Sequence, residues 1–146
     1  MNGVFYVIGG LKFSSMLGLA MQPYAYVASM DAFETKTNCW QKTRVLPMGG
    51  CVIACTTVGR AIYMLTSHAV ELSFWKYDTW VESFTRVKPP PIPSPLRIDN
   101  YLKFSCVTMG TDVYIIQVSS QVQLYTVKLG HIFQFWICYL IGCSSK

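Results

Sequence analysis

The sequence predicts an all-β chain built from repeated antiparallel units, and three observations support this. Of the 146 residues, 52% are hydrophobic and only 13% are charged, so one domain with a packed core is expected. The apolar residues gather in short runs rich in Val, Ile, Tyr and Phe, which are typical of β-strands. These runs recur about every fifty residues and are bounded by glycine or proline.

The first run, VFYVI at residues 4 to 8, is apolar throughout and is followed by Gly9 and Gly10. A strand with one solvated face alternates apolar and polar residues. We therefore expect this strand to be covered on both faces. The glycine pair can adopt positive φ, which lets the chain leave the strand sharply.

The outline of this run recurs in VGRAIYML, residues 58 to 65, and in MGTDVYII, residues 109 to 116. Its tyrosines, Tyr6, Tyr63 and Tyr114, lie 57 and 51 residues apart. The offset of 51 is kept by two further pairs, Cys55 with Cys106 and Gly59 with Gly110. Three coincidences at one offset indicate an internal repeat.

A second block recurs between the copies, and it combines an acidic strand with a turn and a tryptophan. It reads MDAFETKTNCW up to Trp40 and VELSFWKYDTW up to Trp80. The segment ETKTN has the composition of a hairpin turn. Prolines follow each block, at Pro47 and from Pro89, and should end the strands. We expect both tryptophans to fill gaps between neighbouring sheets.

A period near fifty with four short strands per unit is the signature of a β-propeller blade. The units are predicted at about residues 2–48, 51–93 and 103–129, within a partial propeller spanning 1–129. Closed propellers have about four to eight blades, so we predict an incomplete one of two to three four-stranded antiparallel blades. The outer faces of the first and last blades should then be apolar patches. Residues 130–146 are predicted to be a divergent, irregular apolar tail.

The units resemble the kelch repeat, and the long loops resemble those of plant F-box/kelch proteins. The resemblance covers about residues 2 to 129 and is clearest in FYVIGG, in MDAFETKTN and at Trp40. The double glycine is replaced by Thr66-Ser67 and by Gln117-Val118 in the later units, and no F-box is visible. The predicted repeat positions are Tyr6, Gly9, Gly10, Trp40, Gly59, Tyr63, Trp80, Gly110 and Tyr114.

The resemblance implies a non-enzymatic protein–protein interaction module, like the substrate-recognition propeller of an F-box/kelch ubiquitin-ligase adaptor. The chain would be a fragment or truncated form of such a protein. Its partner would be a protein substrate, and a ubiquitin-ligase scaffold would join only if a longer form carries an F-box. Binding is expected in loops, at residues 11–24 and 87–101, although a plain loop stiffened by proline would look the same. The candidate loop residues are Met16, Met21, Pro89, Pro90, Pro91, Pro93 and Pro95.

The alternative function is a metal-dependent kelch-propeller enzyme of the oxidase or specifier-protein type. Such a site needs imidazole, carboxylate or tyrosinate ligands brought together. The chain has two histidines, His68 and His131, and its seven acids are dispersed. We therefore predict no enzyme activity, no catalytic residue, no metal site and no cofactor.

Other functional classes find little support in the charge and cysteine patterns. The net charge of +5 comes from scattered residues, so nucleic-acid binding is not expected. The apolar run at residues 132–142 is much shorter than the roughly twenty residues of a spanning helix, and no membrane association is expected. The six cysteines form no C-x-x-C pair, which favours a reduced, intracellular protein, cytoplasmic or nuclear.

Overall fold

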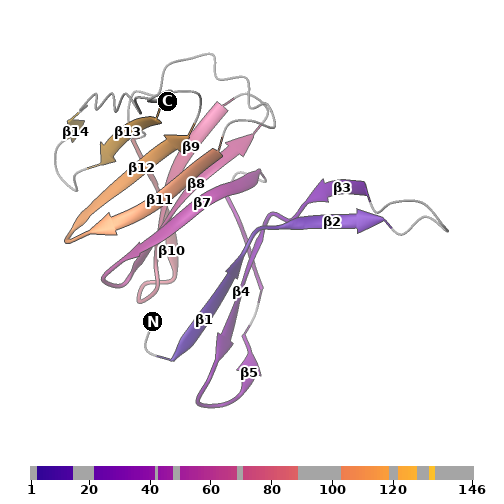
Figure 1. The fold of residues 1–146 in the computed structure, drawn as a ribbon. Coiled ribbons are helices and arrows are strands. Elements are labelled where there is room, and N and C mark those ends of the chain that lie inside the picture. Colours follow the sequence, from indigo (N-terminus) through magenta and orange to yellow (C-terminus); the bar gives the residue numbers. More distant parts are fainter. Residues whose placement is uncertain are drawn as a thin grey trace, which may run out of the picture. The chain divides into compact units, whose positions relative to one another are not determined.

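The computed structural model describes residues 3–14, 22–41, 43–47, 50–68, 71–88, 103–118, 122–127 and 132–133. All regular structure in these residues is β, in fourteen strands. They form three four-stranded sheets and a two-stranded hairpin (Figure 1). The all-β prediction is confirmed. No sheet closes on itself in the described residues, and the propeller arrangement and the unit boundaries stay predictions.

The chain divides into two compact units, Met1–Val52 with Thr66–Leu72, and Ile53–Leu65 with Ser73–Lys146. The first sheet belongs to the first unit and contains β1 (Val4–Ile8), β4 (Ser29–Glu34), β5 (Cys39–Trp40) and β6 (Arg44–Val45). Its order is β1-β4-β5, and β6 also pairs with β4. Tyr6 lies opposite Ala32 and Ile8 opposite Met30. Met30 and Ala32 are buried and form the core side of this sheet.

One strand prediction for this sheet is wrong. Residues 4 to 8 were expected to be covered on both faces, yet Phe5 is 67% and Val7 is 52% exposed. The intervening Val4, Tyr6 and Ile8 are half-buried. An apolar run predicts a strand, but whether each face is covered depends on the neighbouring sheets, which the run itself does not specify.

A hairpin of β2 (Leu11–Ser14) and β3 (Gln22–Tyr26) lies between β1 and β4 in the chain. Much of the predicted loop at residues 11–24 is therefore strand. The chain enters the hairpin through Gly9 and Gly10, whose φ values are 70° and 128°. A Cβ on Gly9 would also lie 3.0 Å from Val52 Cβ, so both the backbone conformation and the available space require glycine there.

The second sheet contains β7 (Cys51–Val58), β8 (Ala61–His68), β9 (Glu71–Asp78) and β10 (Ser83–Val87). Its order is β10-β9-β8-β7. Every residue of β8 from Ala61 to Ser67 is buried. Since successive side chains point to opposite faces, both faces of β8 are covered. This strand shows the burial that was expected of β1.

The third sheet contains β11 (Lys103–Met109), β12 (Asp112–Val118), β13 (Val122–Val127) and β14 (Ile132–Phe133), in that order. Phe104, Val113 and Ile115 are buried. Because β14 pairs with β13, the predicted irregular tail contributes a short strand. Residues 134–146 of that tail lie outside the described residues.

The second and third sheets meet within the second unit at β7 and β11. Thr108 Oγ1 donates a hydrogen bond to the carbonyl of Thr57 at 2.9 Å. The same oxygen lies 2.8 Å from Thr56 Oγ1. A hydroxyl has one proton to donate, so Thr56 is the donor in that second bond. Thr57 and Thr108 are 51 residues apart, so the contact joins equivalent strands of consecutive repeats.

Candidate interaction surface

Two hairpin turns of the same construction stand out in the described residues. Residues 35–38 connect β4 to β5, and residues 79–82 connect β9 to β10. The last residue of each turn has positive φ, 55° for Asn38 and 56° for Glu82. Such turns reverse the chain tightly and present their central residues to solvent.

Each turn is held by a threonine that follows the acid at the end of the strand. Thr35 donates its backbone N–H and its hydroxyl to the carbonyl of Gly3, at 2.8 and 2.6 Å. Thr79 makes the same two bonds to the carbonyl of Arg60, at 3.0 and 2.7 Å. Sequence reasoning missed this clamp. Its signal was the dipeptide Glu34-Thr35, repeated as Asp78-Thr79.

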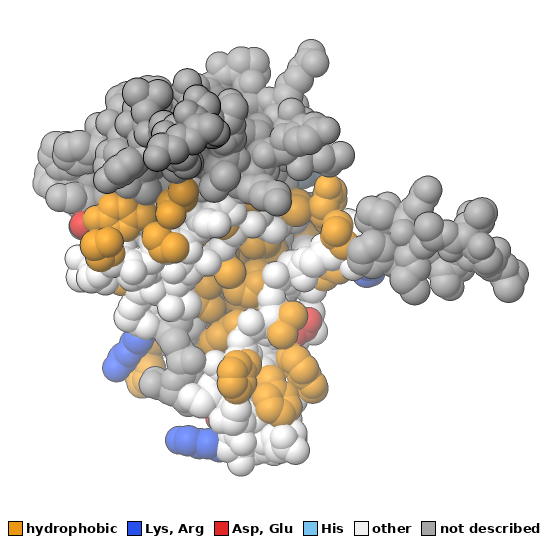
Figure 2. All heavy atoms as spheres, viewed as in Figure 1, with side chains coloured by type: hydrophobic (Ala, Val, Ile, Leu, Met, Phe, Trp, Pro, Cys, Tyr) orange, Lys and Arg blue, Asp and Glu red, His pale blue; other side chains and the backbone are white. Residues whose placement is uncertain are grey.

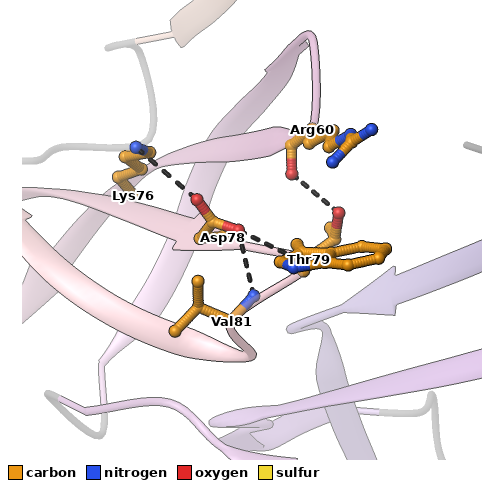
Figure 3. A network of polar contacts seen from close by, with 6 residues as sticks. Arg60, Lys76, Asp78, Thr79 and Val81 are labelled. Carbon is orange, nitrogen blue, oxygen red and sulfur yellow. Dashed lines mark hydrogen bonds and ion pairs between the residues drawn. The ribbon is translucent and has the colours of Figure 1, made fainter.

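The Asp78 carboxylate organises the second turn (Figure 3). Its Oδ1 accepts the backbone N–H groups of Trp80 at 3.0 Å and Val81 at 3.2 Å. Its Oδ2 lies 3.8 Å from the Lys76 ammonium. The backbone bonds from Val81 and then Trp80, with smaller contributions from the charges of Lys76 and Arg60, lower the pKa of Asp78. The carboxylate is therefore ionised at neutral pH and fixes the turn.

The turn displays Trp80, whose side chain is 76% exposed. The Arg60 guanidinium carbon lies 5.1 Å from the centroid of this ring, within the range of a cation–π contact. Val81, the next residue, is 68% exposed. The prediction that Trp80 fills a gap between sheets is therefore wrong. The turn projects the ring outward, so that it contacts the Arg60 guanidinium and is otherwise largely exposed to solvent.

Trp40 is also exposed, at 62%, and the gap-filling prediction is wrong for it as well. It lies opposite Phe33 in the β4–β5 pair, and the two ring centroids are 5.2 Å apart. The matching pair in the second sheet is Tyr77 and Phe84, which lie opposite each other with centroids 4.8 Å apart. The counterpart of Trp40 is therefore Phe84, whereas Trp80 lies within the turn. The sequence comparison matched Trp40 with Trp80 because each precedes a proline segment. The register of the two hairpins shows that they hold different positions, one in a strand and the other in a turn.

The three repeat tyrosines occupy matching places, each the third residue of its strand. Tyr6 is in β1, Tyr63 in β8 and Tyr114 in β12. Gly59 and Gly110 have φ values of 56° and 63° and form the turns before the last two strands. Tyr63 is buried, and that burial, together with the negative charge of Asp78, raises the pKa of its phenol.

The predicted loop residues lie outside the residues that the structure describes. They are Met16, Met21, Pro89, Pro90, Pro91, Pro93 and Pro95. His68, weighed as a metal ligand, is exposed at the end of β8. Among the residues that the structure describes, no three His, Cys, Asp or Glu side chains are grouped so as to hold a metal ion. A search of the same residues finds no helix of the length and apolarity that crossing a membrane requires.

Comparison with known proteins adds one relative. An F-box/kelch-repeat protein of Arabidopsis thaliana is 44% identical over 125 residues, which cover 80% of this chain. The match supports an F-box/kelch-like family. The aligned part spans 30% of that relative's length. No family model matches the chain.

Proposed function

We propose that this F-box/kelch-like chain is a non-enzymatic protein-binding module that acts in substrate recognition for ubiquitination. The similarity to an F-box/kelch-repeat protein supports the general class. The observation that carries the proposal is the turn at Trp80, an exposed aromatic ring beside an arginine on a preorganised backbone. Tryptophan and arginine dominate the hot spots of protein interfaces.

Preorganisation matters because binding otherwise costs the entropy of ordering a loop. In this turn the Asp78 carboxylate and the Thr79 clamp already fix the backbone. Val81 extends the apolar surface beside the ring. A protein partner can therefore bury Trp80 in a pocket without reorganising the hairpin.

The test compares the proteins that co-purify with the wild-type chain and with two variants. Trp80→Ala should reduce recovery of a specific partner about tenfold or more, as expected for the loss of an aromatic hot spot. Thr85→Ala, which alters an exposed side chain of β10 in the same sheet, should leave recovery unchanged. Equal recovery with Trp80→Ala, from a variant that melts like the wild type, would refute the proposed surface.

The adaptor role has a separate test. We propose that a ubiquitin-ligase scaffold associates with this module only through an F-box in a longer form. The scaffold should then co-purify with that longer form and not with residues 1–146, while the partner held through Trp80 co-purifies with both. Recovery of the scaffold with residues 1–146 alone would contradict the adaptor hypothesis but not the binding surface.

We also propose an intracellular location, cytoplasmic or nuclear, on the strength of the cysteine pattern. Imaging of a fluorescent fusion tests this. Signal confined to the secretory pathway would refute it.

A further inference from the structure

The two clamped turns share one backbone construction but display different side chains. The second residue of the turn is Lys36 in the first sheet and Trp80 in the second. The carbonyl that accepts the threonine clamp belongs to Gly3 in one case and to Arg60 in the other. The first turn therefore closes without an arginine and without a tryptophan. Since neither side chain is needed to build such a turn, a role outside the fold accounts better for the pair.

The carboxylates of the second turn are already engaged. Asp78 accepts two backbone N–H groups through Oδ1 and faces the Lys76 ammonium through Oδ2. Glu82 has an interaction partner of its own. Figure 3 shows the Arg60 side chain directed away from the Asp78 carboxylate. Among the described residues, none forms an ion pair with the Arg60 guanidinium, so its charge is available to a partner.

The Arg60 guanidinium is restrained by the Trp80 ring but keeps its hydrogen-bond donors. Its carbon lies 5.1 Å from the ring centroid, and a contact of this kind occupies none of the five N–H groups with an acceptor. Arg60 is exposed at the turn between β7 and β8. A planar guanidinium presents these donors as a fork that matches a carboxylate. Because the ring already restrains the fork, less entropy is lost when it binds.

The surface around this fork combines a single cation with apolar area. Trp80 and Val81 are 76% and 68% exposed, so a complementary ligand carries a carboxylate beside a bulky apolar group. Protein segments supply this combination through neighbouring side chains. Nucleic acid would bring phosphates and stacking bases, but it is bound by grooves lined with several cations. On the face drawn in Figure 2, the Lys and Arg side chains stand apart and form no continuous basic area.

We propose that the Trp80 turn binds an acidic segment of its protein partner. An Asp or Glu side chain of that segment accepts two N–H groups from Arg60, and a neighbouring apolar side chain packs on Trp80 and Val81. Arg60 is then the residue that determines specificity for the acid. Hydrogen bonds to ionised groups are stronger than neutral ones, so the turn should distinguish an acid from its amide. This inference rests on the proposed function, because it names the partner chemistry at the same surface.

Selection of a random decapeptide phage library on residues 1–146 tests this inference without a known partner. The wild type should enrich peptides in which an acidic residue lies next to a large apolar one. Arg60→Gln should keep the apolar preference and lose the acidic one, and Trp80→Ala should enrich neither. Lys36→Gln, which removes one exposed positive charge from the other turn, is the matched control and should select as the wild type does.

Calorimetric titration with one selected peptide gives the magnitude. Changing its acid to the amide and Arg60→Gln should each weaken binding about ten- to hundredfold, and both together should cost little more than either alone. Arg60→Lys should restore only part of the affinity, because an ammonium cannot make the bidentate contact. Added salt should weaken the wild type more than Arg60→Gln. Equal melting temperatures are expected, since these variants keep the carbonyl that Thr79 uses.

The outcomes separate this inference from the proposal on which it rests. Trp80-dependent enrichment of apolar peptides without acids would overturn the acidic partner and leave the binding surface standing. Enrichment that Trp80→Ala does not change, or no enrichment by the wild type, would overturn both. Binding of a single-stranded oligothymidine of about twenty nucleotides, lost in Arg60→Gln, would also overturn the inference, because the turn would then serve nucleic acid.

Discussion

At the scale of single residues, the threonine clamp is the feature that most clearly fixes the hairpin turns. Replacing Thr79 with valine removes the hydroxyl bond to the Arg60 carbonyl while keeping the shape. We expect a loss of about 0.5–1 kcal/mol in the free energy of unfolding, the lower range for one hydrogen bond at an accessible site. Chemical denaturation measures it. Thr79→Ser keeps the hydroxyl and should lose less; an equal loss would show that the bond contributes nothing.

The Asp78 carboxylate should make the stability of this turn depend on pH. Its pKa is lowered in the folded chain by the backbone bonds from Val81 and Trp80. A lowered folded pKa stabilises the fold above the unfolded value, about 3.9, and this contribution disappears as pH falls through the folded pKa. Unfolding free energies of wild type and Asp78→Asn should therefore converge below about pH 4. A difference that stays constant down to acid pH would contradict this assignment.

Cys106 should be less reactive than an exposed cysteine of the same chain. Burial, and secondarily the charge of Cys55, raises the pKa of Cys106 to about 12. The thiolate is the reactive form, so Cys106 should be almost unreactive at neutral pH. Alkylation followed by mass spectrometry should modify the exposed Cys39 well before Cys106. Equal rates in the folded chain would contradict the partial burial of Cys106.

At the scale of elements, the sequence predicts strands well where the repeat is regular. The runs around Tyr6, Tyr63 and Tyr114 are strands, and the acidic blocks form hairpins. The β2–β3 hairpin was missed because its short strands, with Pro23 in one of them, lack the length and composition of a clear strand signal. The tryptophans were misaligned because residue spacing does not reveal hairpin register, which turn geometry sets.

The glycine at which the chain leaves β1 and the glycine in the turn before β8 should not tolerate replacement by alanine equally. Gly9 and Gly59 both have positive φ, but only Gly9 lies against a neighbour, because a Cβ added there would be 3.0 Å from the Cβ of Val52. Gly59→Ala should cost about 1–2 kcal/mol for the left-handed backbone alone. Gly9→Ala should cost more, because Val52 must also move. Thermal denaturation of the two variants gives the comparison, and a smaller cost at Gly9 would contradict the close contact.

At the scale of the whole molecule, burial depends on which sheets are neighbours, and this is what a single run of residues cannot encode. VFYVI and AIYML are almost equally apolar, yet Phe5 is exposed and its counterpart Ile62 is buried. The candidate surface at Trp80 escaped prediction for a related reason. A large aromatic ring suits a gap between sheets and an exposed hot spot equally well, and only the turn geometry decides between them.

This difference in burial predicts unequal costs for alanine at matching positions of the two strands. Ile62→Ala should lower the free energy of unfolding by about 2–5 kcal/mol at any protein concentration, because it opens a cavity in the core. Phe5→Ala should cost less than about 0.5 kcal/mol in dilute solution, as exposed substitutions do. Chemical denaturation of the wild type and of both variants measures the two losses. A loss with Phe5→Ala as large as that with Ile62→Ala would contradict the exposure of Phe5.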